Sequence, residues 1–346
     1  MKSSTKKIFA IDFFSSIGGV SCGFKQAGIN ILGGIDIDIN CKKTYEENIN
    51  APFLNADVSN LKKEELKKIF GIEQNQDDLI FVGCSPCQYY SNIKTDKTKS
   101  CKTRLLLEDF QEFVEYYKPG YIFLENVPGL DKNPDSPLGI FKSYLKLNDY
   151  FFDEGVLNAK YYGVPQNRRR YVLLASRVKK IELPKPDKLN IRSVRDAIGD
   201  TQVFYKINAG FQDKTTFLHS SAKLKDINLA RIKNTPLNGG DRRSWKNDER
   251  LQLDCYRNHE GHYDVYGRMF WDKPSPAITT RFISYSNGRY GHPEQDRAIS
   301  LREGATLQSF PLNYKFFSDS QGVIARMIGN AVPPELAKRI GESIVN

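Results

Sequence analysis

The sequence lacks the long apolar runs and the regular cysteine pattern that mark membrane proteins and disulfide-bonded secreted proteins. No stretch approaches the length of about 18 apolar residues that a membrane span needs. Only 6 cysteines occur in 346 residues, irregularly spaced, so no disulfide framework is indicated. The basic start of the chain is too short and too charged for a signal peptide. We therefore expect a protein of the reducing cytoplasm that makes no membrane contact.

Two common binding motifs are also absent. The chain has no complete Gly-x-Gly-x-x-Gly, so a dinucleotide is not specified. Cys84-x-x-Cys87 is not followed by a second such pair, and the spacing of Cys255, His259 and His262 fits no standard zinc pattern. We therefore expect no metal. A redox pair of Cys84 and Cys87 stays open as an alternative, because Cys-x-x-Cys also occurs in thiol-disulfide exchange.

Positive charge is what the sequence has in excess. The net charge is +10, which favours a polyanionic partner, with nucleic acid first. A hydrophobic content of 40% and a charged content of 27% are ordinary for a globular protein with a sizeable core. The length predicts about two domains.

Short apolar runs alternate with helical patterns in the first half of the chain. Strands are predicted at residues 8–14, 29–35, 53–54, 79–82 and 121–124. This alternation predicts a doubly wound, parallel α/β sheet. The carboxyl ends of parallel strands meet at one edge, where ligands bind. The residues expected at that edge are Gly18, Asp36, Asp57, Cys87 and Glu125.

The first strand, the glycines at 18 and 19 and the following helix have the pattern of a nucleotide-binding loop. Glycine lets a backbone approach a ligand closely. Asp36 follows the second strand, about 20 positions later, where a carboxylate can accept hydrogen bonds from ribose hydroxyls. A plain strand-to-helix turn is the alternative interpretation of this segment.

The second half of the chain is more basic and less regular. Prolines 184 and 186 mark the change, and we predict a catalytic domain at 1–186 plus 318–346 and a small domain at 187–317. The small domain mixes cations, aromatics and amides, which suit phosphate and base-edge contacts. Residues 89–103 follow Cys87 without periodicity, and we interpret them either as a lid or as a solvated loop. Ser300 and Glu303 form a predicted capping box.

An ordered set of motifs carries a family resemblance over nearly the whole chain. The set comprises DFFSSIGG (12–19), Asp36, Asp57, GCSPCQ (83–88) with Ser91, ENV (125–127), QNRRR (166–170), RAISLREGATLQSFP (297–311) and GNAVPP (329–334). The sequence resembles the DNA cytosine-5 methyltransferases, of the bacterial restriction-modification type. The resemblance implies a Rossmann-like, S-adenosylmethionine-dependent methyltransferase of class I, with a smaller, irregular target-recognition domain.

The resemblance also implies S-adenosylmethionine as the methyl donor. Its expected binding residues are Phe14, Ser16, Gly18, Gly19, Asp36, Asp57, Asn330 and Val332. This chain departs from the family at two positions, with Ser16 where glycine is usual and Ser85 where proline is usual. Ser16 concerns the geometry of the donor turn, and Ser85 concerns the loop that carries Cys87.

The expected chemistry begins with Cys87, because C5 of cytosine is a poor nucleophile until a thiolate adds to C6. Glu125, carrying a proton, can hydrogen-bond N3, and Arg170 with Arg168 can stabilise O2. The cytosine must leave the base stack to reach these groups. The catalytic residues are therefore predicted to be Cys87, Glu125, Arg168 and Arg170.

Double-stranded DNA is the expected partner of a monomeric enzyme, with a cognate restriction endonuclease encoded nearby. The expected DNA contacts are Gln88, Ser91, Arg104, Arg242, Arg243, Arg281 and Arg289. One alternative is an RNA cytosine-5 methyltransferase, which catalyses the same reaction on an RNA such as tRNA. A catalytically silent DNA-binding homologue keeps the fold and loses the reaction. Both remain alternatives to DNA methylation.

Overall fold

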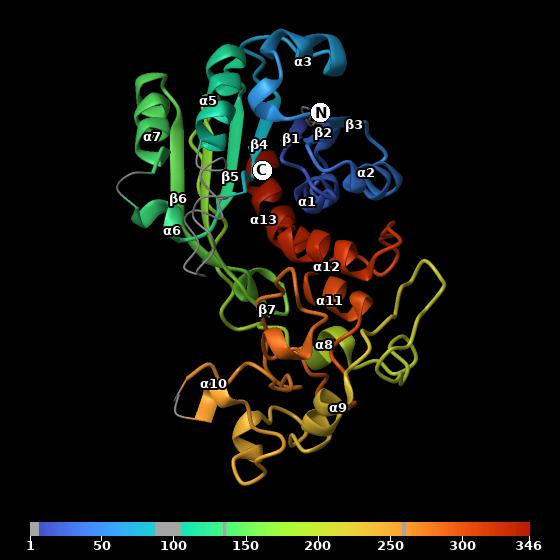
Figure 1. The fold of residues 1–346 in the computed structure, drawn as a ribbon. Coiled ribbons are helices and arrows are strands. Elements are labelled where there is room, and N and C mark those ends of the chain that lie inside the picture. Colours follow the sequence, from blue (N-terminus) through green and yellow to red (C-terminus); the bar gives the residue numbers. More distant parts are fainter. Residues whose placement is uncertain (1–6, 87–104, 134–135, 258–260) are drawn as a thin grey trace. The chain divides into compact units, whose positions relative to one another are not determined.

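A seven-stranded sheet organises the first part of the chain (Figure 1). The computed structural model describes residues 7–86, 105–133, 136–257 and 261–346. The strand order is β3-β2-β1-β4-β5-β8-β6. The strands are β1 (Phe9–Phe13), β2 (Asn30–Asp36), β3 (Phe53–Asn55), β4 (Leu79–Gly83), β5 (Tyr121–Asn126), β6 (Phe151–Asn158) and β8 (Arg169–Ser176). The predicted α/β fold class is confirmed.

The first five strands in this order run parallel, and β8, which lies between β5 and β6, runs in the opposite direction to its two neighbours. β1 pairs in parallel with β2 and β4, β2 pairs with β3, and β4 pairs with β5. β8 is antiparallel to both β5 and β6. The parallel strands therefore bring their carboxyl ends to one edge, as the alternation of strands and helices predicts.

A cluster of phenylalanines fixes one face of the sheet. The ring of Phe13 on β1 lies 5.1 Å from that of Phe81 on β4, and 5.2 Å from those of Phe110 and Phe113. The last two belong to α5 (Leu106–Tyr117), whose buried side chains recur at helical spacing. Each buried phenylalanine stabilises the fold by about 2 kcal/mol, so this face is strongly specified.

The opposite face is covered by α1 (Gly19–Gln26) and α13 (Pro334–Val345) (Figure 1). Phe24 of α1 contacts Phe123 of β5, with ring centroids 5.7 Å apart, whereas the neighbouring Ile122 and Leu124 face the α5 side. Helices on both faces make the sheet doubly wound. The remaining helices of this region are α2 (Lys42–Ile49), α3 (Lys63–Phe70), α6 (Gly129–Lys132) and α7 (Leu138–Leu147).

The chain divides into two compact units. The first unit comprises Met1–Tyr162, Arg169–Pro186 and Ala331–Asn346, and the second comprises Gly163–Arg168 and Asp187–Asn330. The predicted domain boundary at residue 318 therefore falls before the division seen here. A helix at Gln321–Asn330 belongs to the second unit, where Gln308 Nε2 donates to the carbonyl of Ile328 in this helix at 2.9 Å.

The second unit has little regular structure. It contains α8 (Val194–Ile198), α9 (Asp226–Lys233), α10 (Asp254–Arg257), α11 (Leu301–Leu307), α12 (Gln321–Asn330) and a short sheet of β7 (Gln166–Asn167) with β9 (Ser275–Pro276). Its core gathers Trp245, Tyr266 and Tyr285 with smaller apolar residues. The predicted capping box of Ser300 and Glu303 is present at the start of α11. None of the helices in the described part of the chain is long and apolar enough to span a bilayer.

Candidate functional site

The loop between β1 and α1 has a strained backbone. Phe14, Ser16 and Gly18 adopt left-handed conformations, with φ of 58°, 47° and 82°. Such values are rare for residues with a side chain and cost about 1–3 kcal/mol at each non-glycine position. Ser16 therefore occupies a position that glycine fits better. This agrees with the glycine that the family usually has there. Strain of this kind persists where the surrounding structure holds the loop for a purpose.

Two contacts hold this loop in place. The backbone N–H of Ser16 donates to Oδ2 of Asp36 at 2.8 Å. Gly19 lies against the chain that precedes α13, where an added Cβ would stand 2.3 Å from the carbonyl oxygen of Val332. No side chain larger than hydrogen fits there unless that backbone moves. Val332 and Gly19 are thus in contact, and their roles in donor binding stay predictions.

Asp36 ends β2 with a carboxylate that the backbone fixes on both sides. Its Oδ1 accepts from the N–H of Asp38 at 2.8 Å, and its Oδ2 accepts from Ser16. Burial raises the pKa of Asp36, and these backbone donors work against that rise. Each carboxylate oxygen offers two lone pairs, so both can still accept a hydrogen bond from a ligand hydroxyl.

Next to Asp36 lies an apolar side chain that sequence reasoning did not select. Ile37 is 68% exposed, although a large aliphatic side chain is usually buried. Asp57, a predicted donor-binding residue, caps the turn Val58–Asn60 by accepting from the N–H of Ser59 at 3.1 Å. The sequence did contain a signal for Ile37, because an apolar residue that stands between Asp36 and Asp38 at the end of a strand lies in a polar, exposed setting.

Glu125 and Arg170 form an ion pair at the carboxyl end of β5. The Nε of Arg170 lies 3.0 Å from Oε1 of Glu125, and Glu125 is buried. The sheet register explains the pairing: Glu125 is opposite Val172 on β8, and Arg170, two residues away, points to the same face. Two of the predicted catalytic residues are therefore in contact.

The chain that leads to Cys87 is anchored beside Glu125. Asn126 Nδ2 donates to the carbonyl of Ser85 at 3.1 Å, and an added Cβ at Gly83 would meet the ring of Phe110 at 2.6 Å. Burial, and then the nearby carboxylate of Glu125, raise the pKa of Cys84 well above its ordinary value. A thiol in this state is a poor nucleophile, which argues against a redox role for Cys84. Cys87 itself lies outside the described residues.

Arg168 is placed differently from Arg170. It is buried in the second unit, where Nη1 donates to the carbonyl of Ile278 at 3.0 Å and Nη2 to that of Gly329 at 3.2 Å. These bonds tie the loop at Ile278 to the end of α12. They give Arg168 a structural function, and its catalytic role stays a prediction. Asn330 is exposed at the end of the same helix, and its donor contact stays a prediction too.

The predicted DNA contacts in the second unit fall into two groups. Arg289 is engaged in the fold, with Nε 2.7 Å from Asp264 and Nη1 donating to the carbonyls of Gly239 and Arg268. Arg281 is exposed, and Arg243 has a side chain that is 63% exposed and paired with Asp241 at 2.6 Å.

Arg242 lies over the ring of Tyr256 at 4.3 Å and over that of Tyr263 at 5.0 Å. Arg289 also lies over an aromatic ring, that of Phe270 at 5.2 Å, but its guanidinium is engaged by the fold. The DNA contacts of all four arginines stay predictions. Gln88, Ser91 and Arg104 lie outside the described residues.

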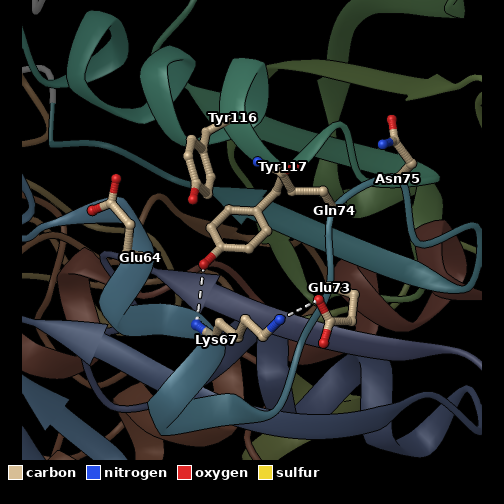
Figure 2. Close-up of a pocket in the computed structure, with 7 residues that line it drawn as sticks. All are labelled: Glu64, Lys67, Glu73, Gln74, Asn75, Tyr116 and Tyr117. Carbon is tan, nitrogen blue, oxygen red and sulfur yellow. Dashed lines mark hydrogen bonds and ion pairs between the residues drawn. The ribbon is translucent and has the colours of Figure 1, made fainter.

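A surface pocket of about 390 Å³ lies away from this edge of the sheet (Figure 2). Its lining residues are Glu64, Lys67, Glu73, Gln74, Asn75, Tyr116 and Tyr117. The loop at Glu73 precedes β4 and Tyr117 ends α5, so the pocket lies at the amino end of β4. Parallel sheets bind their ligands at the opposite edge, so the pocket is separate from the candidate site. In the described part of the chain no group of three potential metal ligands occurs.

Comparison with known proteins agrees with this arrangement. The family model for C-5 cytosine-specific DNA methylase matches residues 8–346. The chain is 38% identical over 342 residues to the Type II methylase M.HgiDII of Herpetosiphon aurantiacus, covering 96% of this chain and 94% of that protein. It is 32% identical over 359 residues to the Type II methyltransferase M1.BsuMI of Bacillus subtilis, covering 96% and 79%.

One solved structure shows the same fold over nearly the full length. It is the crystal structure of a protein from an E. coli prophage, described as a DNA modification methyltransferase. The TM-score is 0.72 at 21% identity, with 98% of each chain covered. At this identity the likeness supports the fold and not the residue roles.

Proposed function

The chain belongs to the C-5 cytosine-specific DNA methylase family, and from this we propose that it methylates C5 of cytosine at a specific sequence in double-stranded DNA. The observation that carries the proposal is the buried ion pair of Glu125 and Arg170. It lies at the carboxyl end of β5, beside the anchored chain that leads to Cys87. A polarising pair next to a thiol is what activation of the cytosine ring needs.

S-adenosylmethionine is the methyl donor that this family implies, and the β1–α1 loop fits it. When bound, it supplies an electrophilic methyl group on a sulfonium. Asp36 would accept hydrogen bonds from the ribose hydroxyls with its fixed carboxylate. The exposed side chain of Ile37 offers an apolar face to the adenine, and Asp57 offers an acceptor to its amino group. The close packing of Gly19 on Val332 would limit the space on that side of the bound donor.

Cys87 would start the reaction by adding its thiolate to C6 of cytosine, which makes C5 nucleophilic. Negative charge then builds towards N3 and O2. Glu125 has to carry a proton to donate to N3, and in the free enzyme its Oε1 is paired with Nε of Arg170 at 3.0 Å. We therefore propose that Arg170 moves to O2 as the base enters, which frees Glu125 to hold a proton at N3. After C5 has gained the methyl group, a base removes the C5 proton, and the bond between C6 and the sulfur of Cys87 breaks to release the methylated base.

The cytosine can reach these groups only if it leaves the duplex. The basic second unit would hold the opened DNA and read the sequence, with Arg242, Arg243 and Arg281 as its proposed contacts. Both curated relatives are named Type II enzymes, which supports a role as the modification partner of a restriction endonuclease. We propose that the enzyme acts as a monomer on one duplex.

Substitution of Cys87 tests the proposal, and Cys84 provides a matched control. Cys87→Ser is expected to abolish methyl transfer to plasmid DNA and to keep DNA binding. Cys84→Ser is expected to keep most of the activity, because the thiol of Cys84 is held in its unreactive form. A Cys87→Ser enzyme that still methylates DNA would overturn the mechanism. Faster transfer to tRNA than to plasmid DNA in the same assay would overturn the proposed substrate.

A further inference from the structure

Asp12 is a buried acid beneath the β1–α1 loop that the proposed reaction does not use. It lies in β1, is 2% exposed, and immediately precedes Phe13. Successive strand residues face opposite sides of a sheet, and Phe13 packs against α5. Asp12 therefore points to the other face, towards α1 and α2, where its bonding partners lie.

The carboxylate of Asp12 is only partly satisfied. Ser21 of α1 donates its hydroxyl to Oδ2 at 2.6 Å and also offers its backbone N–H. The hydroxyl of Tyr45 on α2 lies 3.0 Å from that of Ser21. Oδ1 has no hydrogen-bond partner within the described ranges, and Ser15 Oγ nearby is in the same state. A buried acceptor without a donor costs about 1–3 kcal/mol, so this arrangement needs a reason.

The charged surroundings of Asp12 are negative. Asp36 at the end of β2 and the phenol of Tyr45 on α2 interact with it electrostatically, and Cys84 after β4 is influenced by it. No ion pair joins Asp12 to a cation in the described part of the chain, and Lys25 of α1 donates instead to the carbonyl of Ile49 at 2.8 Å. Burial raises the pKa of Asp12 to about 7, against the opposing effect of Ser21.

The position of Asp12 relates this charge to the donor loop. α1 begins after Gly18, which has no side chain to cap the helix, and Asp12 supplies the missing acceptor to the first turn through Ser21. Gly34 of β2 is paired with Asp12 in the sheet. A Cβ added to Gly34 would stand 2.6 Å from Ser15 Oγ. Asp12 thus lies close to the β1–α1 loop and is hydrogen-bonded to the first turn of α1.

We propose that Asp12 is a positioning residue whose negative charge makes the donor site prefer the cationic sulfonium donor to the uncharged thioether product. The inference rests on the proposed function, since it assumes that S-adenosylmethionine binds to the β1–α1 loop. Its physical basis is that a buried charge without a counterion attracts a cation more strongly than an exposed charge does. Release of the product would then follow from the loss of positive charge on sulfur.

Binding isotherms of S-adenosylmethionine and S-adenosylhomocysteine to the DNA-free enzyme test this between pH 6 and pH 8. The amino and carboxyl groups are common to both molecules, so the ratio of the two affinities isolates the sulfonium charge. The ratio is expected to rise about fivefold with pH, as Asp12 ionises. Asp12→Asn is expected to keep binding and to give a low ratio that does not change with pH.

A second variant keeps the test valid if Asp12→Asn does not fold. Ser21→Ala removes a donor that favours ionised Asp12, so the rise in the ratio is expected to move to higher pH. A pH-independent ratio in the native enzyme, or an unchanged ratio in Asp12→Asn, would overturn the inference while methyl transfer persists. Failure of the native enzyme to bind S-adenosylmethionine at any pH would instead overturn the proposed function and this inference with it.

Discussion

Two buried carboxylates, one in each unit, show opposite solutions to the same physical problem. Glu303 in the second unit is 0% exposed and Asp12 in the first is 2% exposed. Burial works to raise the pKa of Glu303, but Arg297, hydrogen-bonded to it through Nη1 and Nη2 at 2.7 Å, outweighs it and lowers the pKa to about 2. Asp12 has no such partner, and burial raises its pKa to about 7.

The difference separates structural charge from functional charge. Two further groups lie against the carboxylate of Glu303. The N–H of Ser300 donates to Oε2 at 2.6 Å, and Nε2 of His292 lies 3.6 Å from Oε1. Two backbone N–H groups point at Nδ1 of His292, so its proton is on Nε2, facing Glu303. Asp12 keeps an oxygen without a partner, beneath a loop with strained backbone angles. Incomplete bonding and strain are expected where a ligand completes the site.

The largest expected effect is on the second unit. Arg297→Met leaves Glu303 buried without its counterion, and we expect a loss of about 3–5 kcal/mol in the free energy of unfolding. Arg297→Met combined with Glu303→Gln removes the uncompensated charge and is expected to recover most of this loss. Urea unfolding measures both variants. Equal stability of Arg297→Met and the native protein would show that Arg297 is not needed to stabilise the buried charge of Glu303.

The next effect concerns Asp12 and has a defined sign. Folding raises its pKa from 3.8 to about 7, so the folded protein holds this proton more tightly. Stability therefore falls as the pH rises from about 4 to about 7, by about 4 kcal/mol at most. Asp12→Asn should lack this decline, so its stability relative to the native protein should increase with pH. Parallel pH profiles of the two proteins would show that Asp12 does not titrate in this range.

A smaller effect is expected from a methyl group in the donor loop. Gly19→Ala places a Cβ against the carbonyl of Val332, so the backbone must shift. We expect the affinity for S-adenosylmethionine to fall about tenfold. Gly139→Ala is the matched control, because an added Cβ meets nothing within 4 Å at that position. Isothermal titration distinguishes the two, and equal affinities would mean that the loop tolerates the displacement.

The smallest effect is expected at Ser16, which has φ of 47°. Ser16→Gly removes the strain of a left-handed residue and is expected to stabilise the protein by about 1 kcal/mol. Thermal unfolding measures the change. Ser59→Gly has no left-handed strain to relieve and loses the hydrogen bond from Ser59 Oγ to Asp109 at 2.5 Å, so this control is expected to lower the stability. Destabilisation by Ser16→Gly would show that the contact of Ser16 Oγ with Cys41, at 3.7 Å, matters more than the backbone angle.

The sequence predicted the features that depend on local pattern. Apolar runs and glycine turns located the strands, and the carboxyl edge therefore included Asp36 and Glu125. The antiparallel placement of β8 and the pairing of Glu125 with Arg170 depend on sheet register, which no local pattern specifies. The family motif suggested that Arg170 and Glu125 act together, and the structure shows the contact.

Burial produced the remaining differences. Arg168 and Arg289 looked like available cations in the sequence, yet carbonyl oxygens distant along the chain surround both of them. Asp12 belongs to the motif at 12–19, but the motif does not show its environment. In the structure Ser21 donates to Oδ2 of Asp12, and Oδ1 has no hydrogen-bond partner within the described ranges. Such environments are made by residues far apart in sequence, so a single sequence contains no direct signal for them.

The most direct test of the proposed chemistry is a covalent complex on DNA that carries 5-fluorocytosine at the methylated position. Fluorine cannot leave C5 as a proton does, so the enzyme should stay bonded to C6 of the base. Intact mass and peptide mapping should then find the methylated base on Cys87, and Cys87→Ser should give no adduct. An adduct on another residue, or normal methylation of cytosine without any adduct on the fluorinated DNA, would contradict the mechanism.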